Sequence, residues 1–154
     1  MGRMLPTAGA LLCLLSAAAS VHIDTKDGGY KDIRVSISKD VPYDESILEN
    51  IKSLFRSSSE FLHRATNGRV YFKQVTIEVP QTWPMRDSAR PLSLTRFDRS
   101  DVRVDVPTEA QGDMPFTQQL KPCGQPGDFI QLTPGFLSLT QNATAREALN
   151  PGKL

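Results

Sequence analysis

The sequence carries almost no excess charge of either sign. Its 18 lysine and arginine residues nearly balance 17 aspartate and glutamate residues, so the formal net charge of the 154-residue chain is +1. Nucleic-acid-binding domains usually show a basic stripe, and chains that bind anionic membranes show a polybasic run. Neither pattern occurs here. We therefore expect no nucleic-acid partner, and the length allows one domain at most.

The chain also lacks the common motifs of catalytic and metal sites. It has only two histidines, His22 and His63, and no His-Glu-x-x-His pair, which excludes a zinc site of that type. No Gly-x-Ser-x-Gly, Gly-x-Gly-x-x-Gly or P-loop sequence is present. Asp98, Asp101 and Asp105 lack the spacing of an EF-hand, and the last two are interpreted as the solvated side of a strand. We predict no catalytic, cofactor-binding or metal-binding residue in this chain.

Long apolar runs are missing as well, since no stretch reaches the roughly 20 residues that cross a bilayer. The run Ala8–Leu15 follows Arg3 and precedes the small residues at positions 18–20. This arrangement is typical of a secretory signal peptide, and the shortness of the run disfavours the alternative, a membrane anchor. We expect residues 1–20 to be a signal peptide, the mature chain to start near Val21, and the protein to be secreted and extracellular, with no direct membrane span.

Cysteine is scarce, with only Cys13 and Cys123. Removal of the signal peptide would leave Cys123 alone in an oxidising compartment. An unpaired cysteine there implies either an intermolecular disulfide or a partner that is missing from the chain. We favour the missing partner.

The most regular pattern in the sequence lies between Asp44 and Gly68. Residues that are mostly apolar recur there at helical spacing and fall within an arc of about 120°. They are Ile47, Ile51, Leu54, Phe55, Ser58, Phe61, Leu62 and Ala65. The pattern predicts a long amphipathic helix that lies on a flat surface, begins at an Asp44 cap and ends at Asn67-Gly68.

Alternation of apolar and polar residues predicts four strands. They are Tyr30–Ser38, Arg69–Val79, Asp101–Val106 and Asp128–Thr133. The alternation slips at Lys73-Gln74, which suggests a β-bulge. The segments Arg86–Ser100 and Pro107–Gly127 are interpreted as long loops, the arginines of the first as solvated surface, and a weak helix follows Pro134.

The order strand, long helix, strand predicts a crossover with two parallel strands and the helix on one sheet face. The predicted fold class is α/β (α+β), with a mixed sheet of about four strands backed by one long helix. Because one helix covers only one face, we expect the other face to be bare and apolar and the domain to be incomplete.

Six segments carry a family resemblance. They are Gly28–Ile33, Val41-Pro42 with the acidic helix start, Phe61–Thr66, Val70–Ile77, Val79–Trp83, and Cys123 through Pro134. Together they resemble the N-terminal domain of the calcium-activated chloride channel regulator family. The resemblance covers about Gly28 to Phe136, and its Trp83 and Cys123 blocks are specific.

This resemblance implies a secreted, multidomain glycoprotein that modulates chloride conductance without forming a pore, with a chloride channel or another membrane protein at the cell surface as its partner. It also implies a zincin-like, zinc-dependent metalloprotease-like domain that cleaves its own chain. In that family a His-Glu-x-x-His helix follows the stretch matching Thr133–Phe136, whereas residues 137–154 diverge here. Zinc is therefore expected only in the full-length family domain.

We interpret residues 21–136 as a partial N-terminal domain and residues 137–154 as a divergent tail. On this hypothesis the chain is a catalytically inactive fragment, splice product or truncated gene product, which also accounts for the unpaired Cys123. The alternative is a small secreted, non-catalytic binding or decoy module. Asn142-Ala143-Thr144 fits the N-glycosylation sequon and would mark a surface position.

Overall fold

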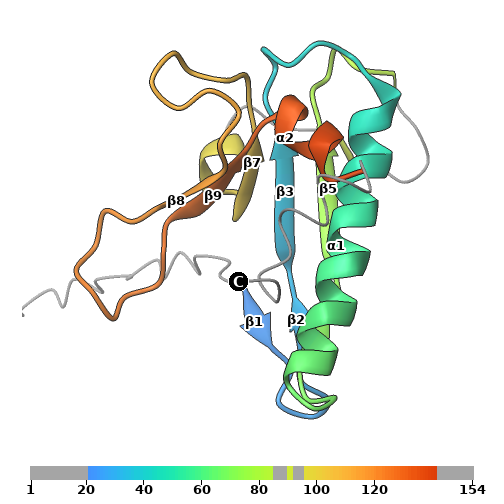
Figure 1. Ribbon diagram of the computed structural model, residues 1–154, viewed down its shortest axis with the longest axis vertical. Coiled ribbons are helices and arrows are strands. Elements are labelled where there is room, and N and C mark those ends of the chain that lie inside the picture. The colour runs from blue at the N-terminus through green and yellow to red at the C-terminus, as the bar shows by residue number, and fades with distance from the viewer. Residues whose placement is uncertain (1–20, 85–89, 92–95, 142–154) are drawn as a thin grey trace, which may run out of the picture.

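The computed structural model describes residues 21–84, 90–91 and 96–141. In these ranges the chain forms two sheets beside one long helix, α1 (Glu45–Ala65) (Figure 1). The larger sheet has the order β6 (Arg90–Pro91), β5 (Val75–Val79), β3 (Ile33–Ile37), β7 (Val102–Val104), β9 (Phe129–Leu132), β8 (Phe116–Gln118). The smaller sheet has the order β1 (His22–Ile23), β2 (Gly29–Lys31), β4 (Tyr71–Phe72). A 3-10 turn, η1 (Phe97–Arg99), and a short helix, α2 (Pro134–Leu139), complete these elements.

The pairing confirms the predicted crossover and the mixed sheet. Strand β3 runs parallel to both β5 and β7, β7 runs parallel to β9, and β8 is antiparallel to β9. The structure adds β6 and β8 to the four predicted strands, inside segments that were predicted to be loops. Strands of two or three residues are too short to show alternation in a sequence, so only pairing with a neighbour reveals them.

Two of the predicted strands break where they pass from the smaller sheet to the larger one. Asp32 separates β2 from β3 with a left-handed φ of 60°, a conformation that aspartate tolerates better than most residues. The suggested bulge at Lys73-Gln74 is the corresponding break between β4 and β5. Both of these backbone amides donate to the Tyr30 carbonyl, at 2.8 and 3.1 Å. The two predicted strands therefore pass from the smaller sheet to the larger one at neighbouring positions, next to Tyr30.

Helix α1 has the predicted ends. The Asp44 carboxylate accepts a hydrogen bond from the Ser46 amide at 2.8 Å, and Asn67 and Gly68 take left-handed φ values of 52° and 79°. Its first half packs as predicted, with Ile47 and Ile51 buried. The prediction is wrong for Phe61, which is 57% exposed, and for Ala65 in the last turn, which is also exposed. The last turns of α1 extend past the larger sheet and lie beside the smaller one, which offers less surface to cover them (Figure 1).

The hydrophobic core lies between α1 and the near face of the larger sheet. Val35, Ile37, Val79 and Val104 are at most 1% exposed there, and Leu137 of α2 is completely buried in the same cluster. Burying each such side chain contributes about 1.5–3 kcal/mol to folding, so this face accounts for most of the packing energy.

The far face of the larger sheet differs from the prediction of a bare, apolar surface. Alternation along β3 places Ser36 and Ser38 on that face, and both are buried. Glu78 of β5 and Ser100, which follows η1, are 2% exposed. The far face is polar in its centre, and the segment 96–100 covers it there.

Candidate functional site

A buried polar cluster occupies the centre of the far face. The Ser36 hydroxyl donates to one Glu78 carboxylate oxygen at 3.1 Å and contacts the Ser100 hydroxyl, and Arg96 Nη1 donates to the other oxygen at 3.1 Å. Ser100 Oγ donates in turn to the Arg96 carbonyl at 3.0 Å. Burying a charge is tolerated when it is paired and hydrogen-bonded, and both Glu78 oxygens meet this condition. The cluster contains no histidine that would activate a serine, so its chemistry fits a clamp that holds the segment 96–100 on the sheet.

Arg103 lies on the same face between two aromatic rings. Its guanidinium carbon lies 3.6 Å from the centroid of Phe129 and 5.7 Å from that of Phe97. Nη2 donates to the Asp98 carbonyl at 2.7 Å, whereas Nε is buried without a hydrogen-bond partner among the described residues. Desolvation lowers the pKa of Arg103 from its ordinary value. Arg103 was not predicted from the sequence, because the two rings that stack on it, Phe97 and Phe129, come from separate segments of the chain.

An apolar groove of about 440 Å³ opens on the helix side, where the smaller sheet meets α1 and the β7–β9 part of the larger sheet. Its lining residues are apolar or aromatic apart from Ser58 and Asp101. Val21 lies in its wall at 37% exposure and Ile130 at 43%. A concave, mostly apolar surface with few polar groups is the usual form of a binding site. Among the surfaces of the described residues, this groove fits a binding role best.

The three aspartates considered from the sequence do not form one site. Asp98 and Asp105 line a second hollow of about 410 Å³ at the carboxyl ends of β3, β5 and β7, beside the paired Lys39 and Asp40. Asp101 lies at the opposite end of β7, in the apolar groove. The structure therefore places Asp101 in a different hollow from Asp98 and Asp105.

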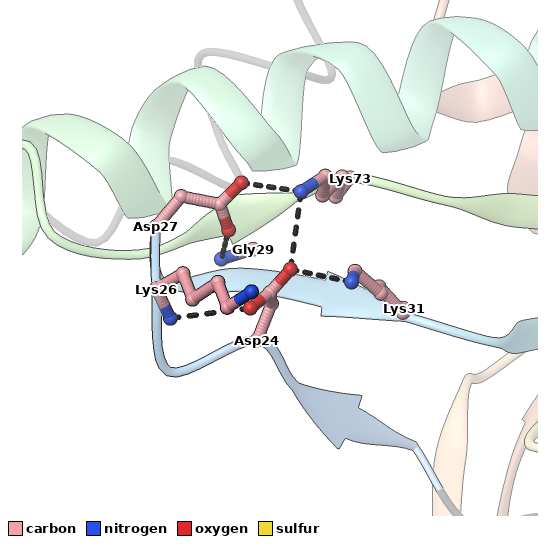
Figure 2. A network of polar contacts seen from close by, with 6 residues as sticks. All are labelled: Asp24, Lys26, Asp27, Gly29, Lys31 and Lys73. Carbon is pink, nitrogen blue, oxygen red and sulfur yellow. Dashed lines mark hydrogen bonds and ion pairs between the residues drawn. The ribbon is translucent and has the colours of Figure 1, made fainter.

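A network of exposed charges joins the turn between β1 and β2 to the end of β4 (Figure 2). Lys73 pairs with both Asp24, at 3.2 Å, and Asp27, and Lys31 pairs with the same Asp24 oxygen. The Lys26 amide donates to Asp24 at 3.1 Å. The carboxylates therefore hold the turn and cross-link two segments that are far apart in the sequence.

These contacts shift the pKa values of three charged groups in the network. The hydrogen bond from Lys31, with those from the Lys26 amide and Lys73, holds the pKa of Asp24 well below its usual range. Lys73 likewise lowers the pKa of Asp27, and that pairing raises the pKa of Lys73. All three groups stay charged near neutral pH. With every cation matched by a carboxylate, the network fits a structural role.

Cys123 lies on the surface as a free thiol within the described part of the chain. Its loop is held by the Gln119 side-chain amide, which lies 3.2 Å from the Lys121 carbonyl and 3.1 Å from the Gln125 carbonyl. His63 is exposed and packs edge-on against Tyr71, with ring centroids 6.2 Å apart, as expected for a surface histidine. The predicted signal peptide, residues 1–20, and the predicted glycosylation site Asn142 lie outside the described residues.

The described residues show neither a metal-binding group nor a helix that could span a membrane. Residues 21–84, 90–91 and 96–141 contain no group of three or more histidine, cysteine, aspartate or glutamate side chains able to hold a metal ion. None of the helices in those ranges has the length and hydropathy needed to cross a bilayer.

Comparison with known proteins places the chain in a family. Residues 23–147 match the family model described as "Calcium-activated chloride channel N terminal". The chain is 37% identical over 131 residues to calcium-activated chloride channel regulator 1 of Bos taurus and 38% identical over 130 residues to that of Homo sapiens. It is 34% identical over 127 residues to human calcium-activated chloride channel regulator 4. No solved structure gives a significant match.

These alignments cover 82–85% of this chain but only 14% of each relative, so the chain spans about one seventh of their length. The family match covers all six segments from which the resemblance was predicted, including the Trp83 and Cys123 blocks. The chain belongs to the calcium-activated chloride channel regulator family and corresponds to its N-terminal region.

Proposed function

We propose that this chain is a secreted, extracellular protein that modulates chloride conductance. The observation that carries the proposal is the family match over residues 23–147, together with relatives whose names describe them as channel regulators. The leader-like composition of residues 1–20 supports the secretory route.

The proposed mode of action is binding and not catalysis. The chain represents the upstream part of a zinc metalloprotease-like domain, and its sequence contains no His-Glu-x-x-His pair to hold zinc and activate water. The groove beside α1 supplies an apolar surface for a protein partner, which we take to be a chloride channel or another membrane protein at the cell surface.

Whole-cell current recording tests this proposal. Purified protein is applied to cells that express a calcium-activated chloride conductance, and the current is compared with that under Ile130→Lys protein. Ile130 lines the groove and is 43% exposed, so a lysine there places a charge in the apolar surface without disturbing the core. Leu120→Lys, at a site 80% exposed and outside the groove, is the matched control.

We expect a changed current with wild-type and L120K protein and no change with I130K. A current that none of the proteins alters would overturn the proposal. The second candidate, a binding or decoy module, is favoured by the groove itself. It predicts groove-dependent binding to the cell surface while the chloride current stays constant.

A further inference from the structure

The first described residue, Val21, and Asp101 line the same groove although they are 80 positions apart in the sequence. Pairing of β1 with β2 places His22 opposite Lys31, so Val21 comes next, beside Asp32. Pairing of β7 with β3 places Val102 opposite Val35, so Asp101 lies beside Arg34. Strands β2 and β3 are consecutive, and β1 and β7 lie on the same side of them in Figure 1. The register thus brings the two residues together at one end of the groove.

Asp101 offers a half-buried carboxylate at that position. One of its oxygens accepts a hydrogen bond from the Arg34 backbone amide at 2.8 Å. The other accepts no hydrogen bond from any other described residue, and no cation among the described residues forms an ion pair with Asp101. Burial raises the pKa of this carboxyl, while the Arg34 amide and charge oppose the shift. A half-buried carboxylate in an apolar wall is stabilised by a nearby cation.

We propose that removal of the leader between Ser20 and Val21 creates an α-ammonium group that pairs with the Asp101 carboxylate and so fastens β1 to the larger sheet. The inference rests on the secretion that is part of the proposed function. In the cleavage, water adds its hydroxyl to the Ser20 carbonyl carbon as the C–N bond breaks, and its hydrogen goes to the Val21 nitrogen. The new amine is mostly protonated at neutral pH, because an α-amino group has a pKa of about 7.7–8.0.

The geometry makes the pairing specific for an amine at position 21. The Val21 side chain already lies in the apolar wall, which anchors the residue next to Asp101. An uncut leader places an uncharged peptide nitrogen there, and one extra residue moves the charge away by up to about 3.5 Å. Both forms leave the Asp101 carboxylate without the α-ammonium partner.

Thermal unfolding of a chain that begins at Val21 tests the pairing without depending on secretion. The chain is released from a fusion by a protease that leaves no added residue, and it is compared with its Nα-acetylated form. Acetylation is expected to lower the Tm by about 3–5 °C, the range for a partly buried ion pair in a chain of this size. In Asp101→Asn protein the same acetylation is expected to change the Tm by less than about 1 °C.

Asp105→Asn serves as the matched control, because Asp105 is a half-buried aspartate at the other end of β7. In this variant acetylation should still lower the Tm by the wild-type amount. Equal acetylation effects in wild-type and D101N protein, or no effect in either, would overturn the proposal.

A second measurement covers the case in which D101N does not fold. The rate at which an acylating reagent labels the Val21 amine is compared in native protein and in 8 M urea, with position-resolved mass spectrometry. Pairing predicts labelling about tenfold slower in the native state, whereas equal rates contradict it. N-terminal sequencing of the protein recovered from culture medium tests secretion and the cleavage position separately.

Discussion

Two polar networks hold this molecule together, and they differ in their environment. The exposed network of Asp24, Asp27 and Lys73 joins segments of the smaller sheet, whereas the buried cluster around Glu78 joins the segment 96–100 to the larger sheet. In the first, the Lys73 and Asp27 side chains are more than a third exposed, so water competes for their charges, whereas Asp24 is 15% exposed. In the second, Glu78 is 2% exposed, and among the described residues Ser36 and Arg96 donate hydrogen bonds to its carboxylate.

The number of ion pairs in a network is therefore a poor guide to its importance for stability. The exposed network has more charge pairs, yet each is screened by solvent and salt. Among the described residues the buried cluster has one salt bridge, and losing a member would leave other buried groups unpaired.

The largest effect is expected from Glu78→Ala. It leaves the Ser36 hydroxyl without its carboxylate acceptor and opens a gap under Arg96, which should lower the free energy of unfolding by about 3 kcal/mol. Urea unfolding followed by circular dichroism measures the change. Glu49→Ala, which removes an exposed pair with Lys52, is the control and should leave the midpoint nearly unchanged. Equal urea midpoints for Glu78→Ala and Glu49→Ala would show that the buried cluster stabilises the fold no more than an exposed ion pair does.

Gly28→Ala should have the next largest effect, about 2–3 kcal/mol of unfolding free energy. Gly28 has a φ of 76°, and a Cβ there would lie 1.7 Å from the Arg69 carbonyl oxygen. Gly124→Ala separates the two causes, because Gly124 has a φ of 85° and open space around it. It should cost only about 1 kcal/mol, and a similar cost for both variants would show that the close approach to Arg69 is unimportant.

Lys73→Met should lower the Tm by no more than about 3 °C at low ionic strength. The decrease should disappear in 1 M NaCl, where charges are screened beyond about 3 Å. The effect of Glu78→Ala, measured in parallel, should persist in that salt because the Glu78 carboxylate is buried, although its partner Arg96 is half-exposed. A Lys73→Met effect that does not depend on salt would show that the network is not mainly electrostatic.

The smallest effect concerns pH. Lys73 lowers the pKa of Asp27 below 3.8, so its stabilisation is complete above that value and is lost as the pH falls through the lower folded-state pKa. The pKa of Lys73 is raised above 10.5, so the same stabilisation is lost only as the pH rises through that higher value. The Tm difference between wild-type and K73M protein should therefore be constant from about pH 5 to pH 9 and shrink below about pH 4. A maximum within the neutral range would contradict this assignment.

Much of the fold was predictable because it is encoded over short distances in the chain. The Asp44 cap, the Asn67-Gly68 end and the crossover from β3 through α1 to β5 all follow from local patterns. Phe61 was misjudged because helical periodicity indicates which side of a helix is apolar but not where the sheet beneath it ends. The far face was misjudged because an alternating strand pattern does not show that Ser36 will find Glu78 and Ser100.

By itself, the sequence determined the family, the long helix and the parallel strands, since these depend on motifs and periodicities that neighbouring residues carry. Only the tertiary structure decided that the predicted strands divide between two sheets at Asp32, and that Val21 and Asp101 share one groove. The physical reason is that strand register and sheet order join residues far apart in the chain. Their pairing energies depend on the whole packed arrangement and not on any local segment.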